Sequence, residues 1–197
     1  MKIIIIGGFL GSGKTSTIIP LARYLVGDNP EGRQKVVILE NEIGEVGIDD
    51  QLLRGAGYEV EGLFSGCVCC TLSGELVLSV MQIRKDINPE YIIMEATGVA
   101  FPKSIRQALA ESLKTDAAVC CVVDGKRWKR LLVPMEMLIK DQLDGADVIL
   151  INKTDSVDEQ TAQEAEDSVR SFNSTAEIHR ISAKSGFDAE RIFKKLL

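Results

Sequence analysis

The sequence lacks the features that mark a membrane protein or a nucleic-acid-binding protein. Its apolar runs stay well short of the roughly 18 residues that a membrane-spanning helix needs. The apolar run after Met1 is also shorter than the core of a signal peptide. Lysine and arginine number 23 against 29 acidic residues, so no excess of positive charge can form a broad phosphate-binding surface. We therefore expect no membrane and no nucleic acid among the partners.

Cysteine and histidine are scarce as well. Five cysteines, an odd number gathered in two places, do not fit the disulfide framework of a secreted protein. This favours reduced thiols and a cytoplasmic location. The single histidine, His179, falls within a predicted strand and is expected to be structural rather than a metal ligand. The sequence has no internal repeat, low-complexity tract or linker, and therefore predicts one domain, 1–197.

Short apolar, β-branched runs alternate with longer amphipathic stretches from end to end. Runs that are apolar throughout fit strands buried on both faces, as in a parallel sheet. Their alternation with helices predicts an α/β fold with a doubly wound, mostly parallel sheet flanked by helices. The predicted strands are 2–7, 35–41, 91–97, 117–124, 147–153 and 177–182. The predicted helices are 13–26, 73–87, 102–113, 134–144, 158–172 and 188–196.

Two local features bear on these helices. Pro20 removes a hydrogen bond from the first helix, so we expect a bend there or a boundary shifted by one turn. Ser156 or Asp158 is expected to cap the helix 158–172, whose first turn is acidic.

The segment GFLGSGKT, Gly8 to Thr15, matches the phosphate-binding pattern G-x-x-x-x-G-K-[ST] between a predicted strand and a predicted helix. Glycines let backbone N–H groups face a phosphate, and the helix N-terminus adds the positive end of its dipole. Lys14 is expected beside the β- and γ-phosphates as a catalytic residue, and the Thr15 hydroxyl is expected to ligate Mg²⁺. The sequence thus predicts a P-loop NTPase whose nucleotide contacts come from Gly8, Gly11, Ser12, Gly13, Lys14, Thr15 and Ser16.

The segment LINKTD ends the fifth predicted strand with Asn152, Lys153 and Asp155. A carboxylate only accepts hydrogen bonds, so Asp155 suits the N1–H and N2–H₂ donors of guanine, which adenine lacks. Asn152 can brace the loop and contact the base edge, and the stem of Lys153 can lie along the ring face. GTP and GDP are therefore the expected nucleotides. The segment ISAKSG, at the end of the sixth predicted strand, adds three candidates: Ser182, Ala183 and Lys184. A backbone amide of Ala183 or Lys184 is expected to meet the guanine O6.

The third predicted strand ends with Glu95, and Gly98 follows in the segment EATG. A carboxylate at that position can hold Mg²⁺ through water or orient the attacking water. Glycine lets a backbone N–H approach the γ-phosphate. Both residues are predicted to take part in catalysis.

Taken in order, GGFLGSGKTS, ENEIGEVGIDDQLL, GCVCC, EATG and NKTD resemble the CobW/HypB/UreG family of GTPases, most closely its CobW branch. The resemblance covers nearly the whole chain. It implies a metallochaperone that couples GTP binding and hydrolysis to delivery of zinc, cobalt or nickel to a client metalloprotein or cofactor-assembly protein. It also implies that ENEIGEVGIDD is a first switch segment, with Glu42 or Asp49 near the Mg²⁺ of the nucleotide. Members usually carry a second, C-terminal domain, so we expect this chain to hold the GTPase domain without that addition.

The stretch SGCVCCTLSG places Cys67, Cys69 and Cys70 within four positions. A disulfide between adjacent cysteines is strained, whereas one between Cys67 and Cys69 is sterically feasible, so a redox switch stays open. A closed zinc site needs four ligands, usually from two paired elements, which the sequence does not offer. The other two cysteines, Cys120 and Cys121, fall in an apolar strand as small buried residues.

The glycines and polar residues around the trio favour a metal site over core packing. Three thiolates with an exchangeable fourth position fit a site for a metal in transit, and soft sulfur ligands select Zn²⁺, Co²⁺ or Ni²⁺ over Mg²⁺. Glu40 or Glu42 can supply the remaining ligand. Metal ligands are thus predicted among Thr15, Glu40, Glu42, Asp49, Cys67, Cys69 and Cys70.

The cysteines lie between the first switch segment and Glu95, so the γ-phosphate can order them and its loss can release the metal. The switch segments contain no evident arginine finger, so we expect slow hydrolysis that a client or a homodimer partner accelerates. The alternative is a regulatory switch module whose cysteines sense redox state or pack. A P-loop small-molecule kinase is disfavoured by the N-K-T-D segment.

Overall fold

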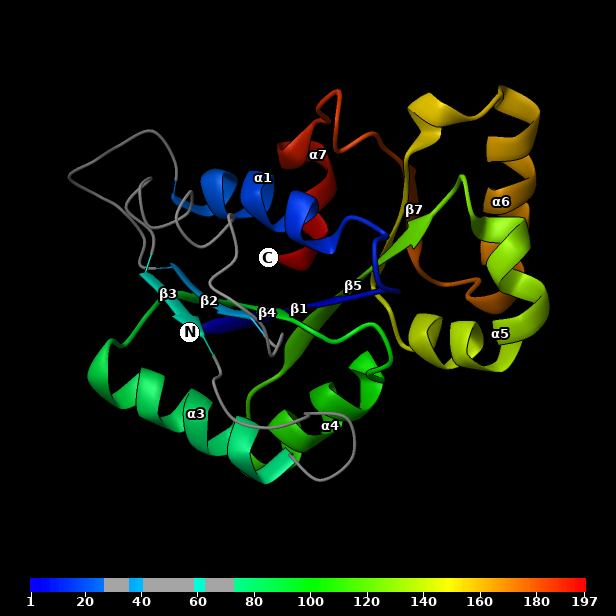
Figure 1. Ribbon diagram of the computed structural model, residues 1–197. Coiled ribbons are helices and arrows are strands. Elements are labelled where there is room, and N and C mark those ends of the chain that lie inside the picture. Colours follow the sequence, from blue (N-terminus) through cyan, green and yellow to red (C-terminus); the bar gives the residue numbers. More distant parts are fainter. Residues whose placement is uncertain (27–35, 41–58, 63–72) are drawn as a thin grey trace.

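The computed structural model, which describes residues 1–26, 36–40, 59–62 and 73–197, is organised around a seven-stranded sheet (Figure 1). Neighbouring strands all run parallel, in the order β3-β2-β4-β1-β5-β6-β7. The strands are β1 (Lys2–Gly7), β2 (Val36–Glu40), β3 (Glu59–Gly62), β4 (Tyr91–Glu95), β5 (Ala117–Asp124), β6 (Val148–Asn152) and β7 (Glu177–Arg180). The helices are α1 (Lys14–Val26), α3 (Ser73–Asp86), α4 (Pro102–Leu113), α5 (Trp128–Leu143), α6 (Glu159–Phe172) and α7 (Ala189–Phe193), with 3₁₀ turns at Thr154–Ser156 and Lys194–Leu196.

Helices cover both faces of the sheet, because successive strand residues point to opposite sides (Figure 1). Along β1, Ile4 and Ile6 join α1 and α7 in one buried apolar cluster. Ile3 and Ile5 join α3, α4, α5 and α6 in the other. The predicted doubly wound α/β fold is confirmed. None of the helices in the described ranges has both the length and the apolar character to cross a membrane.

Three elements differ clearly from those predicted. The edge strand β3 has the sequence EVEG, which is too short and too polar to show a strand pattern, and it was missed. The prediction that α5 starts at 134 was wrong, because the helix begins at Trp128 and continues through Pro134 with a kink at Met135 (φ -132°, ψ 22°). The predicted last helix is shorter than expected, and its end, Lys194–Leu196, is a 3₁₀ turn.

Two other helix features were expected, at Pro20 and at the start of the helix 158–172, and the second is confirmed. Pro20 lies inside α1, which runs as one helix from Lys14 to Val26. Asp158, one of the two predicted caps, accepts a hydrogen bond from the Thr161 N–H at the start of α6.

The winding of the chain reverses at β1, which lies between β4 and β5. In a parallel sheet, such a reversal opens a crevice at the carboxyl ends of the strands. The register places Ile6 of β1 opposite Glu95 of β4, and Asp124 of β5 opposite Asn152 of β6. The predicted phosphate, Mg²⁺ and base residues of the described part therefore meet along one edge of the sheet.

Candidate functional site

The loop after β1 has the backbone shape that its glycines permit. Gly8, Gly11 and Gly13 have φ of 132°, 71° and 101°, values that other residues rarely adopt. A Cβ on Gly8 would lie 2.1 Å from the Val122 carbonyl oxygen, and a Cβ on Gly13 would lie 2.2 Å from Asn152 Nδ2. The loop therefore packs directly against β5 and the end of β6, with Ser12 buried and Ser16 exposed at the start of α1.

The first turn of α1 meets the end of β4. The Thr15 hydroxyl lies 3.1 Å from Glu95 Oε2, and Lys14 Nζ lies 3.7 Å from Glu95 Oε1. Lys14 is 5% exposed, and its Nζ also donates to the Phe9 carbonyl over 3.4 Å. A hydroxyl and a carboxylate side by side are hard oxygen donors of the kind that Mg²⁺ prefers. Thr15 and Glu95 can therefore hold a nucleotide-bound Mg²⁺, and when bound the ion supplies charge neutralisation at the phosphates.

Gly98 lies against the phosphate loop. A Cβ on Gly98 would come within 2.8 Å of the Leu10 nitrogen, so any larger residue would push this segment away from the loop. Its carbonyl accepts a hydrogen bond of 2.6 Å from Gln142 Nε2 of α5. The sequence pointed to Gly98 but not to Gln142, because a lone glutamine in an amphipathic helix shows no signal until the packing of α5 is known.

Asn152 connects the phosphate loop to the two base loops. Its Nδ2 donates to the Ser12 carbonyl over 2.9 Å, and its Oδ1 accepts from the Ala183 and Lys153 N–H groups at 2.9 and 2.8 Å. The predicted bracing role fits this geometry. Since the Ala183 amide is bonded to Asn152, the exposed neighbour Lys184 is the better candidate for the guanine O6.

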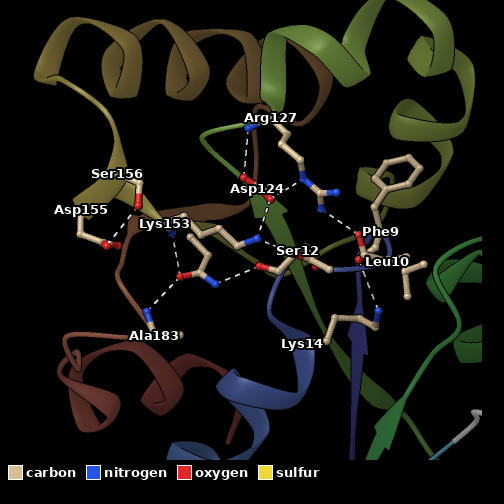
Figure 2. Close-up of polar contacts among 12 residues, drawn as sticks. Phe9, Leu10, Ser12, Lys14, Asp124, Arg127, Lys153, Asp155, Ser156 and Ala183 are labelled. Carbon is tan, nitrogen blue, oxygen red and sulfur yellow. Dashed lines mark hydrogen bonds and ion pairs between the residues drawn. The ribbon is translucent and has the colours of Figure 1, made fainter.

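A charged network links these loops to one another (Figure 2). Asp124 has a side chain that is 1% exposed and accepts from Lys153 Nζ at 2.7 Å and Arg127 Nε at 2.6 Å. Lys153 Nζ also reaches the Gly11 carbonyl at 2.5 Å, and Arg127 Nη2 reaches the Leu10 carbonyl at 2.8 Å. Burial alone would raise the pKa of Asp124, but hydrogen bonds from Lys153 and Arg127 lower it below its ordinary value.

Asp124 and Arg127 were not predicted as site residues. A signal for Asp124 was present, since it ends a buried strand at the same edge as Glu95 and Asn152. No such signal existed for Arg127, whose role follows from the turn that carries it to the phosphate loop.

Asp155 is exposed, at the rim of the site where a base can reach it. A hydrogen bond from the Ser182 hydroxyl lowers the pKa of the Asp155 carboxyl, with smaller contributions from Ser156 and the charge of Lys184. The carboxylate is therefore ionised at neutral pH and can accept two donors from a base edge.

Several predicted metal ligands lie outside the described residues: Glu42, Asp49, Cys67, Cys69 and Cys70. The backbone of Glu40 ends β2 at the same edge of the sheet as the phosphate loop. Among the described residues, no group of three His, Cys, Asp or Glu side chains can hold a metal ion. Cys120 and Cys121 are buried free thiols, and burial raises the pKa of Cys121 to about 12. These two fit the predicted role of core residues.

The parallel sheet and the glycine loop that leads from β1 into α1 define a P-loop nucleoside-triphosphatase fold. The chain belongs to the CobW/HypB/UreG family, since the sequence model of that family's nucleotide-binding domain matches residues 2–180. The resemblance drawn from the motifs is thereby confirmed.

Two curated relatives and one solved structure are similar to this chain. The chain is 29% identical to the zinc chaperone CobW of Sinorhizobium sp over 92% of its length, and 31% identical to the zinc chaperone YeiR of Escherichia coli strain K12 over 81%. It spans only 58% and 48% of those two proteins. The crystal structure of the hydrogenase maturation factor HypB from Archaeoglobus fulgidus aligns with a TM-score of 0.68 at 17% identity, over 97% of this chain and 86% of HypB. At that identity the likeness concerns the fold.

Proposed function

We propose that this protein is a GTPase that couples its nucleotide state to the binding and delivery of a transition metal. The observation that carries the nucleotide part is the meeting of Lys14, Thr15 and Glu95 below a glycine loop, with Glu95 Oε2 only 3.1 Å from the Thr15 hydroxyl. This arrangement suits a magnesium-bound triphosphate. The names of the CobW and YeiR relatives support the metal part and favour zinc as the cargo, ahead of cobalt or nickel.

Different residues of the chain then contact the phosphates and recognise the base. The buried Lys14 ammonium stabilises charge that develops on the β- and γ-phosphates, since a cation in a water-poor site acts strongly. The backbone of Gly98 approaches the γ-phosphate. Glu95 would hold Mg²⁺ through water or orient the attacking water. Asp155 selects guanine, while Asn152 and Lys153 hold the base loops against the phosphate loop.

The metal part rests on Cys67, Cys69 and Cys70, which the sequence places between the first switch segment and Glu95. Thiolates from this trio, with Glu40 or Glu42 as a further ligand, bind the cargo while GTP is present. Hydrolysis weakens the site and passes the metal to a client metalloprotein or cofactor-assembly protein. A coupling of about 1.4 kcal/mol would change the metal affinity tenfold.

The same proposal covers the setting of the reaction. We propose one domain, 1–197, that works in the cytoplasm with reduced thiols. Hydrolysis is slow in the isolated monomer and is accelerated by a client or by a second copy of the chain.

The nucleotide part is tested by measuring GTP and ATP binding and GTP turnover for the wild-type protein and Lys14→Ala. We expect the wild type to prefer GTP, and the variant to lose at least about 100-fold in turnover, since an electrostatic contact made in the transition state is removed. Lys140→Ala, which removes an exposed lysine from α5, is the control and should behave as wild type. Equal turnover by Lys14→Ala, or a preference for ATP, would contradict the proposal.

A further inference from the structure

The side-chain amide of Gln142 is buried at the phosphate edge of the sheet. Gln142 is 2% exposed and lies on the buried side of α5 beside Ile139 and Leu143, which are each 1% exposed. An amide in such apolar surroundings costs free energy unless it is hydrogen-bonded. Its Nε2 finds that partner in the Gly98 carbonyl, at 2.6 Å.

The other end of the residue is anchored too. The Gln142 backbone carbonyl accepts a hydrogen bond of 2.9 Å from Cys121 Sγ in β5. The glutamine is therefore attached to the central sheet on one side and to the segment after β4 on the other. This gives its amide little freedom to follow Gly98 if that segment moves.

Gly98 has a narrow range of positions. It packs so closely on the phosphate loop that a Cβ would lie 2.8 Å from the Leu10 nitrogen and 3.4 Å from the Phe9 carbonyl carbon. A glycine backbone is otherwise free to rotate, so an outside hydrogen bond is needed to fix the direction of its peptide groups. Gln142 supplies that bond through the Gly98 carbonyl.

We propose that Gln142 is a positioning residue that fixes the backbone of Gly98 for contact with the γ-phosphate. The inference rests on the proposed GTPase function and adds to it a residue outside the sequence motifs. Because GDP lacks the γ-phosphate, Gln142 contributes to the binding of GTP and hardly to that of GDP. A purely structural glutamine would affect both nucleotides alike.

The test is Gln142→Met, which keeps the length of the side chain and removes the donor. We expect the affinity for a non-hydrolysable GTP analogue with Mg²⁺ to fall about tenfold, equivalent to about 1.4 kcal/mol, and the affinity for GDP to stay within about twofold. The kcat for GTP should fall as well, because the Gly98 contact persists in the transition state. Gln142→Glu has the same shape but turns a carboxylate oxygen toward the Gly98 carbonyl, so its affinity for the GTP analogue should fall further. It also serves if the methionine variant does not fold.

The matched control is Cys120→Ala, which removes a buried thiol from the same strand but from the apolar cluster on the other face of the sheet. Thermal unfolding of all variants measures the loss of stability that each buried change brings. We expect Cys120→Ala to be less stable but to keep the wild-type preference between the GTP analogue and GDP.

Equal weakening of both nucleotides by Gln142→Met, or unchanged binding of the GTP analogue, would overturn the inference while leaving the proposed function intact. A wild-type protein that binds no guanine nucleotide would overturn the proposed function, and the inference with it.

Discussion

At the scale of single residues, the site depends on a few charged side chains that lie in different surroundings. Lys14 and Asp124 are buried charged groups, and each has oppositely charged or carbonyl partners within 4 Å. Asp155 is the exception, being exposed and held ionised mainly by the Ser182 hydroxyl. Such a carboxylate can exchange its solvent contacts for those of a base, which makes it the residue that best tests base recognition.

Asp155→Asn should move base preference from guanine toward xanthine. The amide offers a donor in place of one acceptor, and xanthine carries a carbonyl where guanine carries its N2 amine. We expect the affinity for GTP to fall at least about tenfold while that for xanthosine triphosphate rises relative to wild type. Competition binding with the two nucleotides measures the change.

Asp158→Asn is the matched control for this substitution. Asp158 carries the same exposed carboxylate, but its hydrogen bond goes to the start of α6, and asparagine caps helices equally well. A GTP preference that is equal in Asp155→Asn and wild type would exclude Asp155 from base recognition.

At the scale of elements, Asp124 at the end of β5 joins three loops through Lys153 and Arg127. Asp124→Asn should destabilise the fold by roughly 1–3 kcal/mol at neutral pH, because two cations lose their carboxylate partner. It should also weaken nucleotide binding, since the phosphate loop loses its support. Urea unfolding measures the first effect and nucleotide titration the second.

The difference in stability between the wild type and Asp124→Asn should depend on pH, because the pKa of Asp124 is lowered in the folded protein. As the pH falls below the ordinary value of about 3.9, the unfolded chain takes up the proton first. The contribution of Asp124 is therefore fully present above that pH and is lost as the pH falls through the lower pKa of the folded state. The stability gap between wild type and Asp124→Asn should shrink in acid. A gap that is equal at neutral and acid pH would contradict this role.

The elements also show where sequence reasoning succeeds. The five apolar strands from β1 to β6 that are buried on both faces were predicted within one or two residues, because an unbroken β-branched run has few other uses. The strand EVEG was not predicted, because its pairing with β2, and not its composition, makes it a strand. The start of α5 was predicted wrongly, because proline usually interrupts a helix, whereas here the helix continues through Pro134 with a kink at Met135.

For the site, the motifs pointed to Lys14, Thr15 and Glu95, which the structure brings together, because phosphate loops and strand ends have local sequence signatures. Arg127 and Gln142 reach the site through long-range packing, 117 and 44 positions from the residues they contact. A single sequence carries no local sign of such contacts.

At the scale of the whole molecule, the proposal joins two regions of the chain. The nucleotide edge is built by β1, β4, β5 and β6, and the described residues contain no metal-binding cluster of their own. The proposed cargo site rests on the cysteine trio, which the sequence places between the first switch segment and Glu95. Nucleotide binding and metal binding are then thermodynamically linked. GTP changes the affinity for the metal by the same factor by which the metal changes the affinity for GTP.

The most direct measurement is a zinc titration against a chelating indicator, with the protein bound to Mg²⁺ and either a non-hydrolysable GTP analogue or GDP. We predict about tenfold tighter zinc binding in the GTP-analogue state, and loss of that binding in Cys69→Ser and Cys70→Ser but not in the buried-core control Cys120→Ala. Equal zinc affinity in both nucleotide states, or unchanged affinity in the two serine variants, would contradict the account.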